Sequence, residues 1–275
     1  MKTGKWFSGK TGPASVALAI LCFLMISCGA DEPQVNTDKY ADWATYSSTH
    51  FNLHFSRQSS WLERQAELGQ GYDRFLKELC SILEFPMPKE TIDLYVYTPG
   101  PETIEMLGDQ KIPFSTENSI HWGGLYPYGY QLTKFLLGQN GIKPGDFEVL
   151  NEGVPHLLDF SGLNYHDKAN RLNNSGQLTR LLDLGDNVKL DSLHFSTRRA
   201  EAASLCGFIM FNYGTPRLYM LWKSSVDWQK SIETIFQLPI DEFETNWLDF
   251  ARGQCADPDG TVENDTIEDM RVIRK

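Results

Sequence analysis

The chain has 275 residues, with 25 lysines and arginines against 36 aspartates and glutamates, and a formal net charge of −11. This acidic balance disfavours nucleic acid as a partner, because the phosphate backbone requires a basic surface. Residues 40–253 suffice for one large domain or two small ones, and no repeat of 20–50 residues is visible.

The N-terminus is typical of an exported protein. Three lysines precede an apolar run over residues 14–26, which is shorter than the roughly 20 residues that a membrane-spanning helix needs. A basic start followed by a short apolar segment predicts a signal peptide over residues 1–27. The run ends in "MISC", which resembles a bacterial lipobox and implies that Cys28 carries the lipid and becomes the mature N-terminus. The alternative is an ordinary secretory peptide, with Cys28 a bystander.

Removal of the signal peptide changes the formal charge from −11 to −14, so the lipid rather than electrostatic attraction would hold the protein at a membrane. Gly29 stands where some lipoproteins carry the aspartate that retains them at the inner membrane. We therefore expect a lipid-anchored protein of the bacterial cell envelope, on the periplasmic or cell-surface side, and at the outer membrane in a host with two membranes. Residues 28–39 are polar and acidic and are interpreted as a tether.

The C-terminal tail and the remaining cysteines suggest no further site. Residues 254–275 are acidic and nearly free of aromatic side chains, which predicts a flexible tail. Cys80, Cys206 and Cys255 are odd in number and lack metal-ligand spacing. Cys80 and Cys206 fall in apolar helical patterns, where buried thiols are common, so no disulfide is predicted.

The first half of the folded part mixes strands with helices. The alternation in "THFNLHF" (residues 49–55) predicts a strand, and helical spacing follows over residues 59–85, with Ser59 or Ser60 as cap. "TIDLYVYT" (residues 91–98) predicts a second strand. A short extended segment around "NSIHWGGLY" (residues 118–126) precedes a helix over residues 129–137.

Helices dominate the second half. "FEVLNEGVPHLLDF" begins another helix, with Asn151 as a possible N-cap and Pro155 in the first turn. Polar sequence over residues 163–191 predicts mostly loop, with one short helix around residues 178–184. An alanine-rich helix then ends on Gly214, and three further helical segments follow.

These elements predict an α+β fold. We expect a small N-terminal mixed sheet with long helices up to about residue 138 and a mostly helical part after it.

Six segments, taken in order, resemble the peptidase MA-like domains, a gluzincin group often found in exported bacterial proteins. They are "THFNLHF", "TIDLYVYT", "YQLTKFLL", "VLNEGVPHLLDF", "ASLCGFIMFNYG" and "NWLDF", and the resemblance covers roughly residues 47–250. It implies a zincin-like fold. In active members two histidines one helical turn apart hold zinc, the glutamate after the first is the general base, and a glutamate on a further helix is the third ligand.

The resemblance places unsuitable residues at the metal site. Tyr130 stands for the first histidine, and a neutral phenol is a poor zinc ligand. Gln131 stands for the general base, and a carboxamide cannot accept a proton from water. Lys134 stands for the second histidine and brings a cation, which at ~4 Å and a dielectric of ~20 repels each unit of charge by about 4 kcal/mol. Only Glu152, the third ligand, is retained, so no catalytic set, zinc or other cofactor is expected.

Two interpretations of the site follow. In the first, Lys134 occupies the vacant position and pairs with Glu152, while Tyr130 donates to the same carboxylate, because a buried carboxylate requires a partner. In the second, Glu152, His156 and His121 form a displaced metal site and the domain is an active peptidase. No G-x-S-x-G elbow, Walker loop or G-x-G-x-x-G motif offers other catalytic chemistry.

We therefore expect an inactive metallopeptidase-like domain, with a dismantled metal site, that binds a peptide or an envelope protein. The candidate binding residues are His121, Tyr130, Lys134, Glu152 and His156. An active peptidase with the displaced site and a purely structural envelope protein are the alternatives.

Overall fold

The structure is a computed structural model that describes residues 40–56, 58–98, 114–116, 118–123 and 127–255. By its internal contacts the chain divides into Met1–Asp38 and Lys39–Lys275, and every described residue belongs to the second unit. The predicted signal peptide, the cysteine predicted to be lipidated, the predicted tether up to residue 39 and residues 256–275 of the predicted tail lie outside the described residues.

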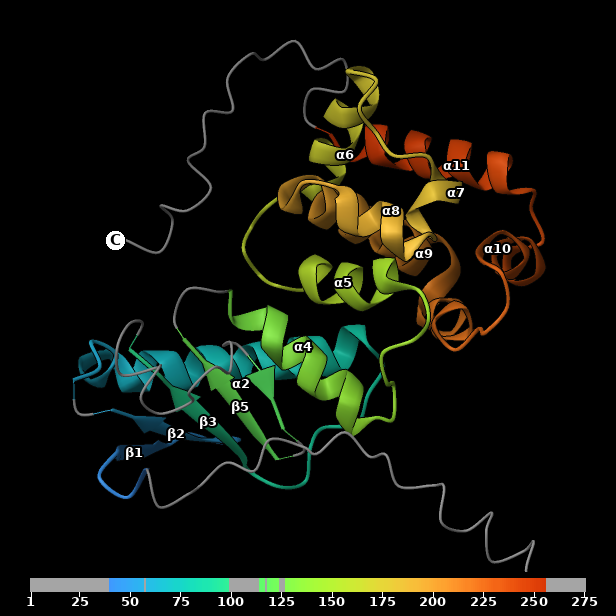
Figure 1. The fold of residues 1–275 in the computed structure, drawn as a ribbon. Coiled ribbons are helices and arrows are strands. Elements are labelled where there is room, and N and C mark those ends of the chain that lie inside the picture. Colours follow the sequence, from blue (N-terminus) through green and yellow to red (C-terminus); the bar gives the residue numbers. More distant parts are fainter. Residues whose placement is uncertain (1–39, 57, 99–113, 117, 124–126, 256–275) are drawn as a thin grey trace, which may run out of the picture. The chain divides into compact units, whose positions relative to one another are not determined.

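A five-stranded mixed sheet forms the N-terminal part, as predicted. Its strands are β1 (Ala44–Ser47), β2 (Phe51–Phe55), β3 (Ile92–Val96), β4 (Phe114–Ser115) and β5 (Ser119–Trp122). The strand order is β1-β2-β3-β5-β4; the central three strands run parallel, and β1 and β4 are antiparallel edges (Figure 1). Parallel neighbours need a long crossover, and helix α2 (Gln65–Ile82) supplies it between β2 and β3.

The alternation in β2 determines which face of the sheet is packed on α2. Phe51, Leu53 and Phe55 are fully buried, and β2 contacts α2. Asn52 and His54, between them, lie on the opposite face and are half-buried. The strand predicted from "THFNLHF" is confirmed.

Helix α2 is preceded by a 3-10 turn, η2 (Leu62–Arg64), rather than starting at the serine pair. Ser59 Oγ accepts a hydrogen bond from the backbone N–H of Trp61 at 3.3 Å in the turn before η2. Neither η2 nor α2 has a side-chain cap, so the predicted serine cap is wrong. The helix ends at Ile82, before Pro86, because proline cannot continue it.

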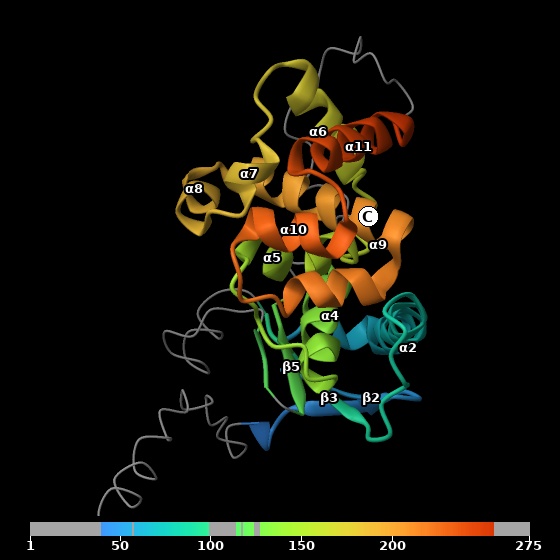
Figure 2. The ribbon, with the colours of Figure 1, turned by 90° about the vertical axis from the view of Figure 1, so that its right-hand side faces the viewer.

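Helices make up the rest of the described chain (Figures 1 and 2). They are α4 (Tyr128–Gln139), α5 (Glu148–Leu157), α6 (Tyr165–Asn174), α7 (Leu181–Leu184), α8 (Asn187–Ser192), α9 (Phe195–Trp222), α10 (Trp228–Phe236) and α11 (Ile240–Gly253). Helix α9 contacts α5, α6, α10 and α11, while α4 contacts α5, α2 and β5. A continuous hydrophobic core therefore extends from the sheet through α4 and α5 to the C-terminal helices. The α+β prediction is confirmed.

The alanine-rich helix ends where the sequence predicts. Within α9, Gly214 has φ 81° and ψ 162°, which breaks the helix in two, and Pro216 then begins the second part. Glycine tolerates this positive φ because it has no Cβ. None of the helices in the described ranges is both long and apolar enough to cross a membrane.

Two expectations for the helical part are wrong. Residues 163–191 contain three helices instead of one, because Asn164 and Asp186 cap α6 and α8 by accepting hydrogen bonds from the backbone N–H groups that follow them. Asn151 does not cap α5, which begins at Glu148. Its amide instead bonds both backbone groups of Gly145, at 2.9 and 3.0 Å, and Pro155 lies in the last turns of the helix.

Candidate functional site

Tyr130 on α4 and Glu152 and His156 on α5, which the sequence singles out, lie together. The ring centroids of Tyr130 and His156 are 4.6 Å apart, and Glu152 Oε2 is 3.9 Å from His156 Nε2. We call these three residues, with Asp159 and Arg198, the His156 cluster.

A glycine allows α4 to approach the end of α5. The Gly129 N–H donates to the carbonyl oxygen of Asp159 at 3.1 Å. A Cβ at position 129 would lie 2.0 Å from the carbonyl oxygen of Leu158, so any other residue would force the two helices apart. Tyr130, the next residue, is thereby held against His156.

His156 is buried between two carboxylates. It is 5% exposed, its Nε2 is 3.9 Å from Glu152 Oε2, and its Nδ1 is 3.9 Å from Asp159 Oδ2. Neither ring nitrogen has a hydrogen-bond partner within the described part of the chain. Burial lowers the pKa of His156, and the charge of Arg199 adds to this, against the opposing effect of the two carboxylates. The ring is therefore neutral at pH 7.

Arg198, at the start of α9, neutralises the charge of Glu152. Its Nη2 is 3.3 Å from Glu152 Oε1, and its Nη1 donates to Asp191 Oδ1 at 2.8 Å. The side chains of Glu152 and Arg198 are only 17% and 19% exposed. A carboxylate so far out of water requires a cationic partner, and α9 provides it.

The prediction that Lys134 pairs with Glu152 is therefore wrong. Lys134 is exposed, and its Nζ lies 5.6 Å from the centroid of the Tyr130 ring. A lysine stem can run along an aromatic face while the ammonium stays in water, which avoids the cost of desolvating it. Arginine, with a more weakly hydrated guanidinium, is better suited to the buried pair.

Gln131, at the position where the resemblance predicts a general base, is 2% exposed. Its Oε1 has no hydrogen-bond partner among the described residues. A buried carboxamide has no basic lone pair to activate water. Together, Tyr130, Gln131, Lys134 and an arginine-bound Glu152 do not fit a zinc ion.

Asp159, which the sequence did not single out, completes the cluster. It accepts hydrogen bonds from the Ser161 N–H, at 2.7 Å, and from the Tyr165 hydroxyl. Burial tends to raise the pKa of Asp159, but His156, Ser161 and Tyr165 outweigh it and the pKa is lowered. Asp159 is therefore ionised. The sequence does contain a pattern that could have indicated Asp159. It is the "D-x-S" turn after a helix, in which the aspartate side chain commonly accepts a hydrogen bond from the backbone.

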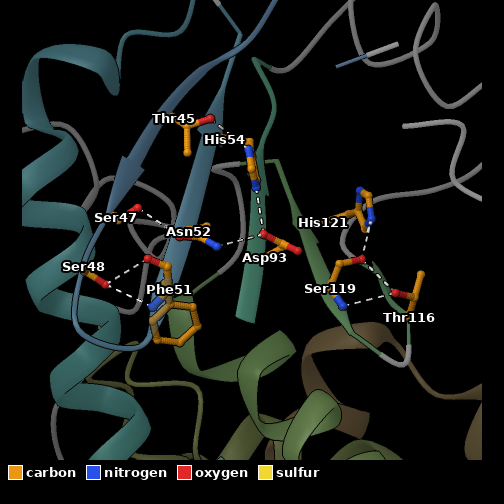
Figure 3. Close-up of polar contacts among 10 residues, drawn as sticks. All are labelled: Thr45, Ser47, Ser48, Phe51, Asn52, His54, Asp93, Thr116, Ser119 and His121. Carbon is orange, nitrogen blue, oxygen red and sulfur yellow. Dashed lines mark hydrogen bonds and ion pairs between the residues drawn. The ribbon is translucent and has the colours of Figure 1, made fainter. Parts of the chain in front are cut away.

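His121 lies outside the His156 cluster, in a network on the sheet. It is fully buried on β5, with Nδ1 2.7 Å from the Tyr97 hydroxyl and Nε2 3.0 Å from Ser119 Oγ. Both ring nitrogens are thus engaged, as Figure 3 shows for the Ser119 side. Burial, and to a smaller extent the charge of His54, lowers the pKa of His121 to about 3.

The displaced metal site is not assembled. His121 is engaged on the sheet, and Glu152 and Asp159 approach different nitrogens of His156. Within the described ranges, no group of three or more histidine, cysteine, aspartate or glutamate side chains is arranged to hold a metal ion. Cys80, Cys206 and Cys255 carry free thiols.

The network around His121 joins four strands. The rings of His54, Tyr95, His121 and Phe114 stack in sequence, with centroids 4.6, 4.8 and 4.1 Å apart. These residues are register partners on β2, β3, β5 and β4. Asp93 binds His54 Nε2 at 2.9 Å on the same face (Figure 3). Cross-strand stacking of this kind stabilises a sheet, so the network has a structural explanation.

The chain matches no protein-family model, and no curated protein is significantly similar to it in sequence. The geometry and chemistry of the His156 cluster therefore carry the functional argument.

Proposed function

We propose that this chain is a lipid-anchored protein of the bacterial envelope whose domain has a gluzincin-like arrangement without metallopeptidase activity. The surface around the His156 cluster then serves to bind a peptide or an envelope protein. One observation carries the proposal. Tyr130 and Glu152, at two positions of the expected metal site on separate helices, both lie against His156, yet their surroundings suit no metal.

The order of elements supports the gluzincin-like arrangement. A strand (β2), a long helix (α2), a second strand (β3), and the helices α4, α5 and α9 follow one another as the resembling segments do. Helix α4 also contacts α5, which is the contact that a metal site shared by the two helices would require.

Charge compensation supports the loss of metal. In a gluzincin the third-ligand glutamate is neutralised by zinc, whereas Arg198 takes that role at Glu152. A divalent cation near this carboxylate would be repelled by the guanidinium. We infer that an arginine has replaced the metal as the cation that stabilises α5.

The exposed side chains around the cluster favour binding. Phe195 is 50% exposed, and its ring centroid is 5.9 Å from that of His156. Tyr130 is half-buried next to His156, with Lys134 Nζ over its ring. Exposed aromatic rings next to cationic groups are typical of the residues that dominate protein and peptide interfaces.

Zinc content tests the metal part of the proposal. Full-length protein, purified in detergent without chelator, is compared with Tyr130→His/Gln131→Glu/Lys134→His and with the same variant carrying Arg198→Ala. We expect no stoichiometric zinc in the wild type and zinc in the variants, with higher affinity once Arg198 is removed. Stoichiometric zinc in the wild type contradicts the proposal. A folded fourfold variant that takes up no zinc contradicts the assignment of these positions.

Peptide binding is tested separately. A displayed library of random peptides is selected against the wild type, and the enriched peptides are measured against Phe195→Ala and Tyr130→Ala. We expect both substitutions to weaken binding about tenfold or more, as truncation of a central aromatic residue does. Phe211→Ala, at another exposed phenylalanine, is the matched control. Enrichment of no peptide, or equal loss in the control, rules out this surface.

A further inference from the structure

A second candidate site shares no residue with the His156 cluster. It is a cavity of about 450 Å³ formed by α2, the segment before it and the start of α4. Its walls include Trp61, Phe75 and Tyr128, and the exposed side chains of Glu67, Gln70 and Arg74 contribute polar groups. Small-molecule sites in proteins have this size and this mixture of aromatic walls with a few polar side chains.

The three aromatic residues are each half-buried, so part of every ring stays accessible. Phe75 and Tyr128 are stacked, with ring centroids 5.8 Å apart and an angle of 24° between the planes. Trp61 meets Tyr128 edge-on at 6.4 Å. Tyr128 and Trp61 also pack on Trp122 of the core, which holds these walls in place.

A helical glycine leaves the cavity open. A Cβ at Gly71 would meet only a Phe75 ring atom, at 4.0 Å, so packing does not require glycine there. Gly69, two residues earlier, differs: its Cβ would lie 2.9 Å from the Tyr46 ring, so packing against β1 explains it. Glycine is a poor residue for a helix interior, and at position 71 its effect is to leave space beside Phe75.

Two charged side chains line the cavity, and of these Glu67 has an ion-pair partner whereas Arg74 has none among the described residues. Arg64 and Glu67 form a two-point pair, with Nε–Oε2 2.9 Å and Nη2–Oε1 2.6 Å. Arg74 lies 4.9 Å from the Phe75 ring centroid, and no carboxylate of the described residues pairs with it. An arginine without a carboxylate partner can offer two N–H groups to a carboxylate ligand.

We propose that this cavity binds an aromatic group that carries a free carboxylate, such as the C-terminal aromatic residue of a peptide. The ring occupies the open space beside Gly71, against the accessible parts of Trp61, Phe75 and Tyr128, and the carboxylate pairs with Arg74, with Gln70 as a further donor. The cavity shares no lining residue with the His156 cluster, so the proposed function and this inference can fail separately.

The test uses N-acetyl-phenylalanine and its uncharged amide as probes, in NMR titrations of the full-length protein in detergent. We expect saturable binding of the acid and at least tenfold weaker binding of the amide. Arg74→Gln should reduce the affinity for the acid to that for the amide. Gly71→Leu should abolish binding of both probes, because the side chain fills the cavity.

Gly138→Leu is the matched control, since a Cβ at this helical glycine meets no atom within 4 Å and the residue does not line the cavity. It should bind the acid as the wild type does, and thermal unfolding should show that all the variants are folded. Equal binding of acid and amide overturns the inference, as does unchanged binding in Gly71→Leu. Failure of the acid to bind the wild type overturns it as well.

Discussion

At the scale of single residues, the main finding is that the partner of Glu152 comes from a distant helix. A metal, a lysine or an arginine could each have balanced this carboxylate. The structure pairs it with Arg198, and Lys134 stays in solvent over Tyr130. The residues of the expected site on α4 thus lie near those on α5, but among the described residues no ion pair joins the two sets.

We predict that Arg198→Met lowers the free energy of unfolding by about 1–3 kcal/mol, because it leaves the Glu152 carboxylate without a cation. The double variant Glu152→Gln/Arg198→Met should lose less than the sum of the two single changes, by about 1 kcal/mol. Urea unfolding of the four proteins measures this coupling.

Lys134→Met is the control for this cycle. Lys134 is exposed, so its replacement should change stability by less than about 0.5 kcal/mol and show no coupling to Glu152→Gln. Coupling of Glu152 to Lys134 rather than to Arg198 would contradict the observed pairing.

At the scale of elements, close packing of α5 on α9 positions the cluster. A Cβ at Gly153 would lie 2.4 Å from the carbonyl oxygen of Ala202 and 2.5 Å from Cys206 Sγ. Glycine therefore allows the two helices to approach closely next to Glu152, and this approach places Arg198 within reach of the carboxylate.

We expect Gly153→Ala to destabilise the protein by about 2 kcal/mol or more, because the clash involves backbone. Gly138→Ala, in α4, should instead stabilise by up to about 1 kcal/mol, since alanine is the better helix former and the site is open. Thermal or urea unfolding of both variants gives the comparison. Equal effects of the two substitutions would show that the α5–α9 contact is looser than described.

At the scale of the whole molecule, buried neutral histidines make stability depend on pH. Burial lowers the pKa of His166 to about 4, and burial together with His54 lowers that of His121 to about 3. An unfolded histidine titrates near 6.5, so between these values the unfolded chain binds more protons. The contribution of these two histidines to the free energy of unfolding is therefore fully present above pH 6.5 and falls as the pH is lowered.

The expected loss is about 2 kcal/mol for each of these two histidines between pH 6.5 and pH 5. Urea unfolding at both pH values measures it. In His121→Gln the difference between the two pH values should shrink by about 2 kcal/mol, whatever the absolute stability of the variant. An undiminished difference would show that His121 is not held neutral.

The predicted lipid anchor on Cys28 also concerns the whole molecule. If Cys28 is lipidated, cells supplied with labelled palmitate should yield labelled protein in the membrane fraction, and Cys28→Ser should abolish both the label and the membrane association. Cys22→Ser, within the predicted signal peptide, is the matched control and should leave both unchanged. A labelled Cys28→Ser protein would exclude this anchor.

Local patterns in the sequence determined much of the fold. The alternation of Phe51, Leu53 and Phe55 defined a strand, Gly214 marked the break in α9, and the change from strands to helices indicated α+β. Each of these depends on a few neighbouring residues, which is why it can be read without the tertiary structure. Helices α6 and α8 were not predicted, because their polar composition is typical of loops, and the asparagine and aspartate that cap them are also common in turns.

Tertiary structure alone decided the chemistry of the site. It brought Arg198 to Glu152, placed Asp159 against His156, and set His121 apart on the sheet. Such contacts join residues far apart in the chain, and the partner of a buried charge is whichever group the packing of helices presents to it. The sequence by itself determined that the residues at the expected metal positions are unsuitable ligands; only the fold showed which cation stands beside the carboxylate that remains.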